Sequence, residues 1–126
     1  MARVAIVTGG TRGIGEAISI ALKDAGMEVA ATYAGNDDRA REFTNRTGIK
    51  AYKFDVADHQ ACLDGVAQIE ADIGPADVLV NNAGITRDTT MKRMDHAKWQ
   101  DVIDTNLGGC FNMAKAVFEG MQSPLP

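Results

Sequence analysis

A cluster of glycines near the N-terminus has the spacing of a turn that binds phosphate. Gly9, Gly13 and Gly15 lie in the segment Thr-Gly-Gly-Thr-Arg-Gly-Ile-Gly, between an apolar run and a stretch with helical spacing. Glycine permits a sharp turn there and lets the backbone approach a pyrophosphate, whose charge the N-terminus of the following helix stabilises. Because the motif joins a predicted strand to a predicted helix, it predicts a dinucleotide site that includes Gly9, Gly13, Ile14 and Gly15.

Alternating strands and helices place this turn at one edge of a sheet. The expected strands are 3–8, 28–33, 50–54 and 77–80, and a helix follows each of them. Since parallel strands are joined by right-handed crossovers, this order predicts a Rossmann-type α/β fold, a doubly wound parallel sheet with the strand order 3-2-1-4. The direction of winding reverses between the first and fourth strands, and ligands bind outside the strand ends at such a point.

The last predicted helix is long and carries two glycines near its middle. It begins near His96, with Asp95 as its N-cap. Gly108 and Gly109 weaken the helix by about 1 kcal/mol each relative to alanine, so we expect them to serve close packing or a local kink. Helical spacing predicts that the buried face consists of Trp99, Val102, Ile103, Cys110, Val117 and Met121.

The chain resembles the short-chain dehydrogenase/reductase family in its glycine turn and in three later segments. The turn has that family's Thr-Gly-x-x-x-Gly-x-Gly spacing, and Asn81-Asn82-Ala83-Gly84 after the fourth strand matches its second hallmark. Asp55 and Val56 lie near the family's adenine pocket, and Asn106 lies where the family has the asparagine of its catalytic tetrad. The resemblance therefore implies a catalytic role for Asn106 and cofactor contacts from Asp55, Val56, Asn82, Ala83 and Gly84.

The resemblance covers nearly the whole chain, from residue 3 to about residue 121. We expect one dinucleotide-binding domain over residues 1–121 and a tail over residues 122–126 that departs from the family. Because the tail stands where the family continues into its fifth strand, we expect the chain to be truncated before that strand.

The family's catalytic serine and Tyr-x-x-x-Lys pair have no counterpart in this chain. Its two tyrosines, Tyr33 and Tyr52, are followed four residues later by Asp37 and Val56 rather than by lysine. In the family, that tyrosine donates a proton to the developing alkoxide and the lysine lowers its pKa. We therefore expect the chain to be inactive on its own. A non-catalytic dinucleotide-binding module is the alternative.

The end of the second strand favours NADP(H) as the cofactor. Family members that prefer NAD(H) have an acid there, which binds the ribose 2′-hydroxyl. This chain has Tyr33 and then no acid before Asp37, which we interpret as the cap of the next helix. Arg12, inside the glycine turn, suits bidentate contact with a 2′-phosphate, with a solvated surface arginine as the alternative. Arg39 and Arg41 could add positive potential there, but their helical spacing more simply makes them solvent-facing.

The segment after the fourth strand resembles that of 3-oxoacyl thioester reductases. Residues 82–88 and a methionine-rich stretch carry this resemblance, while residues 33–38 and 103–107 look most like those of acetoacetyl-CoA reductases of bacterial polyhydroxyalkanoate synthesis. Reductases of acyl-carrier-protein thioesters are the alternative. Candidate substrate contacts are Asp88, for which a loop cap is the alternative, and Met91 and Met94, for which core packing or a flexible cover is the alternative.

Composition argues against several other classes of protein. The net charge is −4 with acids and bases interspersed, which indicates neither a nucleic-acid partner nor a basic membrane-binding face. Without a leader-like start or a long apolar run, the sequence predicts a cytoplasmic protein. Cys62 and Cys110 have no metal-like spacing, so we expect buried free thiols and no metal site. An unpaired fourth strand, and the family's use of the long helix as an interface, predict a homo-oligomer.

Overall fold

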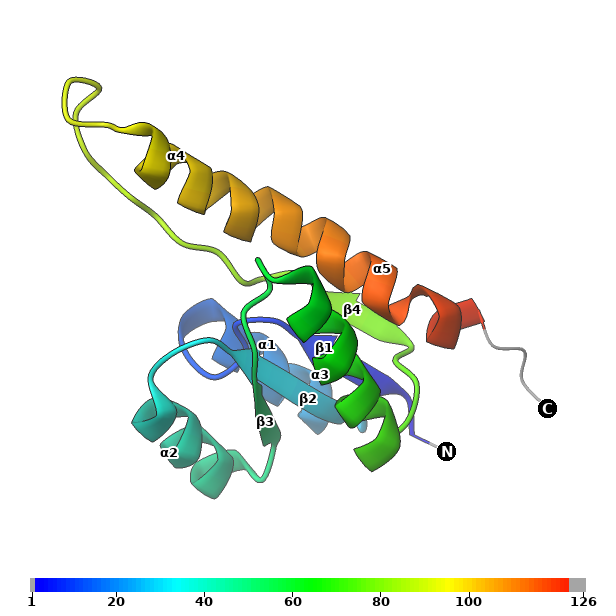
Figure 1. The fold of residues 1–126 in the computed structure, drawn as a ribbon. Coiled ribbons are helices and arrows are strands. Elements are labelled where there is room, and N and C mark those ends of the chain that lie inside the picture. Colours follow the sequence, from blue (N-terminus) through cyan, green and yellow to red (C-terminus); the bar gives the residue numbers. More distant parts are fainter. Residues whose placement is uncertain (1, 123–126) are drawn as a thin grey trace.

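Four parallel strands form one sheet at the centre of the structure (Figure 1). The strands are β1 (Val4–Val7), β2 (Glu28–Tyr33), β3 (Lys50–Lys53) and β4 (Val78–Val80). They are ordered β3-β2-β1-β4, and each neighbouring pair is parallel. The predicted Rossmann-type sheet with strand order 3-2-1-4 is therefore confirmed. The computed structural model describes residues 2–122, so the expected tail over 122–126 lies outside the described residues except for Gln122.

Helices cover both faces of the sheet. One face carries α1 (Gly13–Asp24) and α2 (Asp37–Thr47), and the other carries α3 (His59–Asp72) and α5 (Gly109–Gln122) (Figure 1). None of the helices in residues 2–122 has both the length and the apolar character that crossing a membrane requires.

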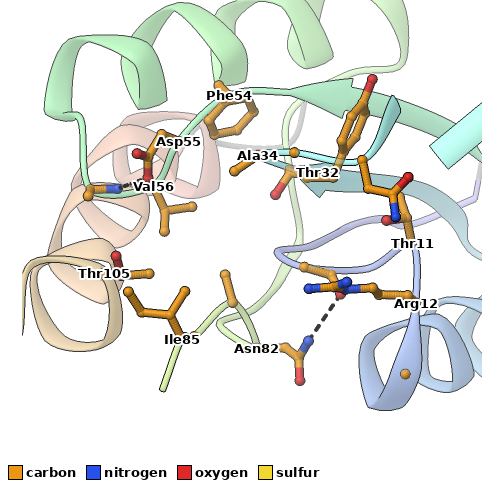
Figure 2. Close-up of a pocket in the computed structure, with 18 of the residues that line it drawn as sticks. Thr11, Arg12, Thr32, Ala34, Phe54, Asp55, Val56, Asn82, Ile85 and Thr105 are labelled. Atoms are coloured by element: carbon orange, nitrogen blue, oxygen red, sulfur yellow. Dashed lines mark hydrogen bonds between the residues drawn. The ribbon is translucent and has the colours of Figure 1, made fainter. Parts of the chain in front are cut away.

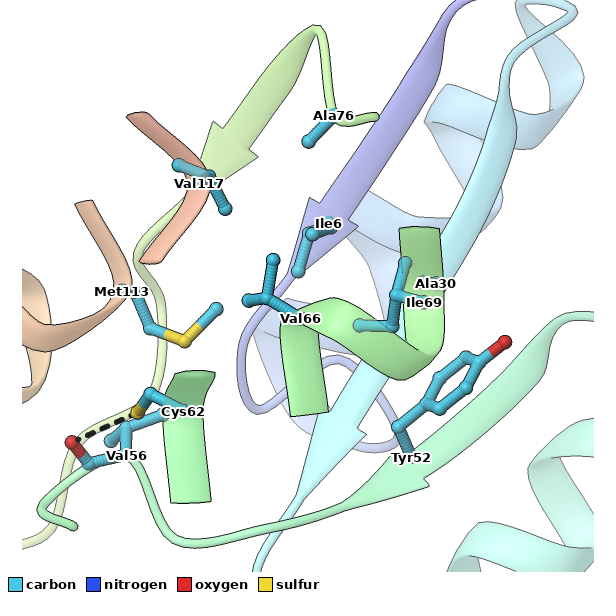
Figure 3. Packing of buried hydrophobic residues seen from close by; sticks show 10 residues of the cluster. All are labelled: Ile6, Ala30, Tyr52, Val56, Cys62, Val66, Ile69, Ala76, Met113 and Val117. Atoms are coloured by element: carbon cyan, nitrogen blue, oxygen red, sulfur yellow. Dashed lines mark hydrogen bonds between the residues drawn. The ribbon is translucent and has the colours of Figure 1, made fainter. Parts of the chain in front are cut away.

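Side chains on neighbouring strand positions point to opposite faces, so the sheet has a core on each side. Ile6 and Ala30 pack against α3 and α5, as Figure 3 shows. The residues that follow them along the strands, Val7 and Ala31, pack instead with Phe43 of α2. All five side chains are fully buried. The sheet is therefore a rigid base for the loops that follow its strands.

The helix after β2 begins differently from the sequence prediction. Asn36 is its N-cap, with φ 35°, and the Asn36 side chain accepts a hydrogen bond from the backbone N–H of Arg39. Asparagine visits this left-handed conformation more readily than most residues do. Asp37 is the first helical residue, and its carboxylate contacts Lys53 and the Tyr33 hydroxyl. The predicted capping role of Asp37 is wrong, because the residue before it caps the helix.

One continuous long helix comprises α4 (His96–Val102), a π-helical segment η1 (Ile103–Gly108) and α5 (Figure 1). The predicted buried face is wrong at both ends, since Trp99 is 50% exposed and Met121 is 42% exposed. Trp99 is exposed because α4 extends away from the sheet and has no buried residue, whereas beyond η1 the wider π-helical turn shifts the phase that a uniform α-helical period predicts. The buried residues of α5 are Gly109, Asn112, Met113 and Val117.

Candidate dinucleotide-binding site

A pocket of about 720 Å³ lies at the carboxyl ends of the strands (Figure 2). Residues 32–36, 54–57 and 82–85, which end or follow β2, β3 and β4, line the pocket together with the glycine turn after β1. The long helix contributes Asp101 and Thr105 to the opposite wall. The pocket therefore lies at the edge of the sheet where the direction of winding reverses, which is where this architecture binds ligands.

The glycine turn packs against the segment that follows β4. Gly15 is buried, and a Cβ atom there would lie 2.0 Å from the carbonyl oxygen of Gly9. Gly9 itself has φ 63°, and a Cβ atom on it would lie 3.1 Å from the Cα of Ala83. Gly13 has φ 58°, which strains any other residue even though the space beside it is open. Gly9 and Gly15 therefore let the turn pack tightly against its surroundings, and only Gly13 of these three has open space beside the backbone.

Gly10, a further glycine of the turn, has a role that the sequence reasoning missed. A Cβ atom on Gly10 would lie 2.8 Å from both Ser19 Oγ and the carbonyl oxygen of Val7. The buried Ser19 hydroxyl donates a hydrogen bond to the Gly10 carbonyl oxygen at 3.0 Å. Ser19 therefore ties α1 to the turn. A serine on the inward face of an amphipathic helix is the signal that could have revealed this contact.

The N-terminus of α1 faces the pocket with free polar groups. Arg12 is the N-cap, and its side chain makes no capping hydrogen bond. The N–H groups of the first turn have no acceptor within the helix, so they offer hydrogen bonds and partial positive charge to an anion. Arg12 lines the pocket, and Figure 2 shows its side chain extending across it. The Ile14 side chain, by contrast, is 76% exposed and does not line the pocket.

Asn82 fastens the glycine turn to the end of β4. Its side-chain Nδ2 donates to the carbonyl oxygens of Thr8 and Gly9, each at 3.2 Å. The Thr8 hydroxyl oxygen in turn accepts hydrogen bonds from the backbone N–H groups of Asn82 at 3.0 Å and Ala83 at 2.9 Å. Asn82, Ala83 and Gly84 all line the pocket. The asparagine thus holds together the two loops at which the winding reverses.

Asn106 lies in η1 and contacts the loop after β4. Its Oδ1 accepts from the backbone N–H of Ile85 at 2.8 Å, and its Nδ2 donates to the Ile85 carbonyl oxygen at 3.0 Å. Together with Gly84, Ile85 and Arg87, Asn106 lines a smaller adjoining pocket of about 460 Å³. Asp88 is exposed and lines neither pocket. The structure therefore places Asn106 at the edge of the site and leaves Asp88 outside both pockets.

The loop after β3 forms another wall of the pocket. Asp55 and Val56 both line it, as the resemblance implied they would lie near a ligand. The Asp55 carboxylate accepts a hydrogen bond from the backbone N–H of Ala57 at 2.9 Å, which stabilises the turn into α3. Val56 is 5% exposed, and its carbonyl oxygen accepts a hydrogen bond from Nδ2 of Asn112 on α5.

Arg39 is a candidate binding residue that the sequence reasoning set aside. Its side chain is partly exposed but lines the pocket beside residues 34–36, so the alternative of added positive potential applies rather than a purely solvent-facing place. Helical spacing could not show this, because it does not say what the face of α2 that carries Arg39 meets. Arg39 Nε is buried without a hydrogen-bond partner in the described part of the chain. Its guanidinium lies 3.9 Å from Glu16, whose carboxylate binds Arg46 at 2.8 Å.

Asp37, the first acidic residue after β2, is bound by Lys53 and Tyr33. Lys53 Nζ lies 3.1 Å from Asp37 Oδ1, and hydrogen bonding from Lys53 and then from Tyr33 lowers the pKa of Asp37. Loss of hydration, followed by the hydrogen bond to Asp37, raises the pKa of Tyr33. Asp37 does not line the pocket, although Tyr33 does. Asp37 is therefore ionised and engaged away from the pocket.

The two cysteines are free thiols in different surroundings. Cys62 is buried, and its burial raises the pKa of the thiol to about 11. Cys110 is half-buried rather than buried as predicted, because it follows the π-helical segment, and its thiol donates to the Asn106 carbonyl oxygen. Residues 2–122 contain no group of three or more histidine, cysteine or acidic side chains that could hold a metal ion.

Comparison with known proteins agrees with this geometry. The family model described as short chain dehydrogenase matches residues 3–124. The chain therefore belongs to the short-chain dehydrogenase/reductase family. It is similar to an acetoacetyl-CoA reductase of Paracoccus denitrificans, with 62% identity over 122 residues that cover 97% of this chain and 50% of that protein. A 3-oxoacyl-(acyl-carrier-protein) reductase of Staphylococcus aureus is 42% identical over 117 residues, 89% of this chain and 48% of that protein.

A solved structure shows the same fold. A double mutant of a short-chain dehydrogenase/reductase from Serratia marcescens superposes with a TM-score of 0.88 at 32% identity, covering 94% of this chain and 51% of that chain. The chain thus spans about half the length of the curated relatives that it matches. Membership of the family implies a nicotinamide dinucleotide as the cofactor.

Proposed function

We propose that this chain forms the NADP(H)-binding half of a reductase that converts acetoacetyl-CoA, a 3-oxoacyl thioester, to 3-hydroxybutyryl-CoA. One observation supports the choice of cofactor: Arg12 and Arg39 line the pocket near the end of β2, and no acid lines it between residues 32 and 39. The buried, unpartnered Nε of Arg39 suits a phosphate oxygen as its acceptor. NADP(H) carries such a phosphate on its adenosine ribose, and NAD(H) does not.

The residues around the pocket fit a nicotinamide dinucleotide. Gly9 and Gly15 let the turn pack tightly, Gly13 leaves open space beside the backbone, and the N-terminus of α1 suits a pyrophosphate. Asp55 and Val56 provide the wall that we assign to the adenine. Once bound, the reduced cofactor supplies a hydride to the carbonyl carbon of the substrate. The role of this chain is to bind and orient the cofactor and to present Asn106 at the edge of the site.

The choice of substrate rests on the relatives. Acetoacetyl-CoA reductases share more of this sequence than does the acyl-carrier-protein reductase compared above, so a CoA thioester is the proposed substrate. By the same reasoning we propose a role in polyhydroxyalkanoate synthesis and a cytoplasmic location. Asp88, although exposed, is the proposed substrate contact on the loop after β4.

We further propose that the chain binds cofactor but does not reduce substrate on its own. Its 126 residues include no Tyr-x-x-x-Lys sequence. A positioned general acid typically contributes about 10²- to 10⁴-fold to a rate, and a lost ribose contact also impairs hydride geometry. NADPH oxidation by the purified chain with acetoacetyl-CoA tests the proposal, and turnover near that of a full-length relative would contradict it.

Self-association is also part of the proposal. β4 pairs only with β1 among the described strands, so it is an edge strand that offers unpaired backbone groups. The long helix exposes large apolar side chains, including Leu107, Phe111 and Phe118 at 67%, 64% and 52%. Exposed apolar surface of this kind is typical of interfaces between subunits.

Cofactor titrations test the proposed specificity. We expect the chain to bind NADPH more tightly than NADH when nicotinamide fluorescence is followed. Arg39→Met and Arg12→Met should each weaken NADPH binding about ten- to hundredfold, since a hydrogen bond to a charged group contributes about 1.5–3 kcal/mol. The affinity for NADH should change little, because NADH lacks the phosphate that both arginines are proposed to bind.

Arg41→Met is the matched control, because Arg41 lies on the same helix and pairs with Asp38 at the surface. It should leave the affinity for both cofactors unchanged. Equal affinities of the unmodified chain for NADPH and NADH would contradict the choice of NADP(H). Equal losses for NADPH and NADH in the Arg39 variant would show that Arg39 does not act on the 2′-phosphate.

A further inference from the structure

We infer that Asn112 of α5 is a positioning residue for the cofactor pocket, because it fixes the loop 54–57 through the carbonyl group of Val56. The inference builds on the proposed function and adds a residue that lies outside the pocket. Asn112 is 8% exposed, and its Nδ2 donates a buried hydrogen bond of 2.8 Å to the Val56 carbonyl oxygen. The two residues are 56 positions apart in the sequence.

The orientation of the Asn112 amide follows from its partners. A carbonyl oxygen only accepts hydrogen bonds, so the amide nitrogen must face Val56. The amide oxygen therefore faces His59, whose Nδ1 lies 3.1 Å away. That ring nitrogen must donate, so neutral His59 carries its proton on Nδ1 and leaves Nε2 as the acceptor. The His59 ring also stacks on Phe111, with ring centroids 6.2 Å apart and planes inclined at 22°.

The backbone of α5 comes unusually close to this loop. A Cβ atom on Gly109 would lie 2.7 Å from Val56 Cγ2, so only glycine lets the helix approach so far. Gly109 and Asn112 are three residues apart and therefore share one face of the helix. The Val56 side chain thus lies against Gly109 while its carbonyl group is bound by Asn112. The Cys62 thiol, 3.5 Å from the same carbonyl oxygen, is a second and weaker donor.

The other end of the loop is held by α3. A Cβ atom on Gly65 would lie 2.4 Å from the ring of Phe54, so the ring occupies the space that a side chain at position 65 would take. Phe54, Asp55, Val56 and Ala57 all line the pocket. The wall is therefore held at Phe54 by α3 and at Val56 by α5. Losing the hydrogen bond from Asn112 would free the end of the wall that lies nearer the long helix.

Asn112→Leu tests this inference by removing both side-chain hydrogen bonds at similar volume. Titration with 2′,5′-ADP, the adenosine end of NADP, should show at least fivefold weaker binding. The amides of Ala57 and Asp58, which are bonded to Asp55 in the native loop, should exchange with solvent faster in the ligand-free variant. Nitrogen NMR of His59 should show the Nδ1–H tautomer in the unmodified chain and its loss in the variant.

Two further variants separate positioning from general destabilisation. Asn112→Asp keeps an acceptor toward His59 but replaces the donor toward Val56, so it should weaken 2′,5′-ADP binding while preserving the proton on His59 Nδ1. Asn112→Asp also serves as a second variant if Asn112→Leu does not fold. Ile49→Ala lowers stability from the opposite face of the sheet, at the end of β3 away from the pocket, and it should leave 2′,5′-ADP affinity unchanged at a similar loss of Tm.

The outcomes distinguish this inference from the proposed function. Binding of 2′,5′-ADP as tight in both Asn112 variants as in the unmodified chain would overturn the inference alone. If the unmodified chain binds neither 2′,5′-ADP nor NADPH, the proposed function fails. The amide exchange rates of Ala57 and Asp58 in the ligand-free protein then still decide whether Asn112 fixes the loop. Equal rates in the unmodified chain and in Asn112→Leu would overturn the inference.

Discussion

Two regions on either side of the pocket are built in contrasting ways. The first, which we call the interlock, consists of residues 8–15 and 82–84. Its hydrogen bonds join positions more than seventy residues apart, as between Asn82 and Thr8. The second, which we call the outer segment, runs from Ile85 to Leu107. Figure 1 shows its loop and α4 extending away from the sheet, and Met91 and Trp99 in it are 89% and 50% exposed.

The contrast concerns which contacts hold each region. Most hydrogen bonds of the outer segment are local, such as those from Lys98 to Asp95 and from Gln100 to Asp104. The pairing of Asn106 with Ile85 is a longer connection within it. The interlock is therefore preorganised by the fold of this chain, and the outer segment is not. Phosphate binding should accordingly be robust, whereas the geometry at Asn106 should be easily disturbed.

The largest effect should come from a side chain inserted into the interlock. In Gly15→Val the new Cβ would meet the Gly9 carbonyl oxygen at 2.0 Å, and backbone atoms cannot move aside cheaply. We expect a loss of about 3 kcal/mol or more in unfolding free energy, at the upper end of overpacking costs, and loss of NADPH binding. Urea denaturation followed by circular dichroism measures the first effect, and fluorescence titration the second.

Substitutions at two other glycines serve as references for the effect of Gly15→Val. Gly13→Ala has open space but φ 58°, so it should cost about 1 kcal/mol through strain alone. Gly35→Ala has neither a clash nor a positive φ and should leave stability unchanged. If Gly15→Val is no more destabilising than Gly13→Ala, the interlock is looser than its contacts indicate.

A matched pair of asparagine substitutions compares the two regions directly. Asn82→Ala leaves the Thr8 and Gly9 carbonyl oxygens without their donor in a partly buried place, and should cost about 1–3 kcal/mol. Asn106→Ala removes two hydrogen bonds to the Ile85 backbone at an exposed site, and should lower the free energy of unfolding by about 1 kcal/mol or less. Thermal unfolding of both variants measures the difference. Equal losses would remove the distinction between the regions.

A charge on the exposed face of the long helix should alter assembly more than stability. Phe118 is 52% exposed, so Phe118→Lys should change the free energy of unfolding by less than about 1 kcal/mol. If this face mediates self-association, the variant should have a lower average mass than the unmodified chain in light scattering across a concentration series. A single monomeric species for the unmodified chain at high concentration would contradict self-association itself.

The smallest effect concerns the pH dependence of α4. The backbone N–H of Lys98 bonds to the Asp95 carboxylate, and this is the main cause that lowers the pKa of Asp95. Because the folded pKa lies below the unfolded value of about 3.9, the cap stabilises the helix fully above that pH and is lost as the pH falls through the folded pKa. The protection factor of the Lys98 amide, which is its exchange rate relative to the intrinsic rate at the same pH, should therefore fall on acidification, and Asp95→Asn should remove most of that pH dependence.

Sequence reasoning was most successful where chain order and local chemistry decide the structure. The strand order follows from the alternation of strands and helices, and the glycine turn, Asn82 and Val56 all line the pocket because each follows a strand. Parallel strands bring such segments to one edge whatever the details of packing. The bounds of β2 agree with the prediction for the same reason, since a short apolar run between turns leaves little freedom.

The predictions that failed, and the contact that was missed, each have a specific cause. Helical spacing says which residues lie on one face of a helix but not what that face meets, so Arg39 was assigned to solvent although it lines the pocket. The buried face of the long helix was misplaced beyond η1 because a π-helical turn leaves no simple mark in the pattern. Asn112 was missed because its partner, the Val56 carbonyl group, is a backbone group that any residue type would supply.

The π-helical segment makes the long helix sensitive to insertions and deletions in a particular way. Asp101 before the segment and Thr105 within it line the pocket, while Met113 and Val117 beyond it are anchored in the core. A π-helical turn holds about one residue more than an α-helical turn, so deleting one residue between Ile103 and Gly108 would restore a regular α-helix and leave α4 and α5 close to their present relative orientation. Deleting one residue from α4 instead would rotate the residues before it by about 100° against α5, which the core holds in place. A one-residue deletion should therefore be tolerated better in this segment than in α4.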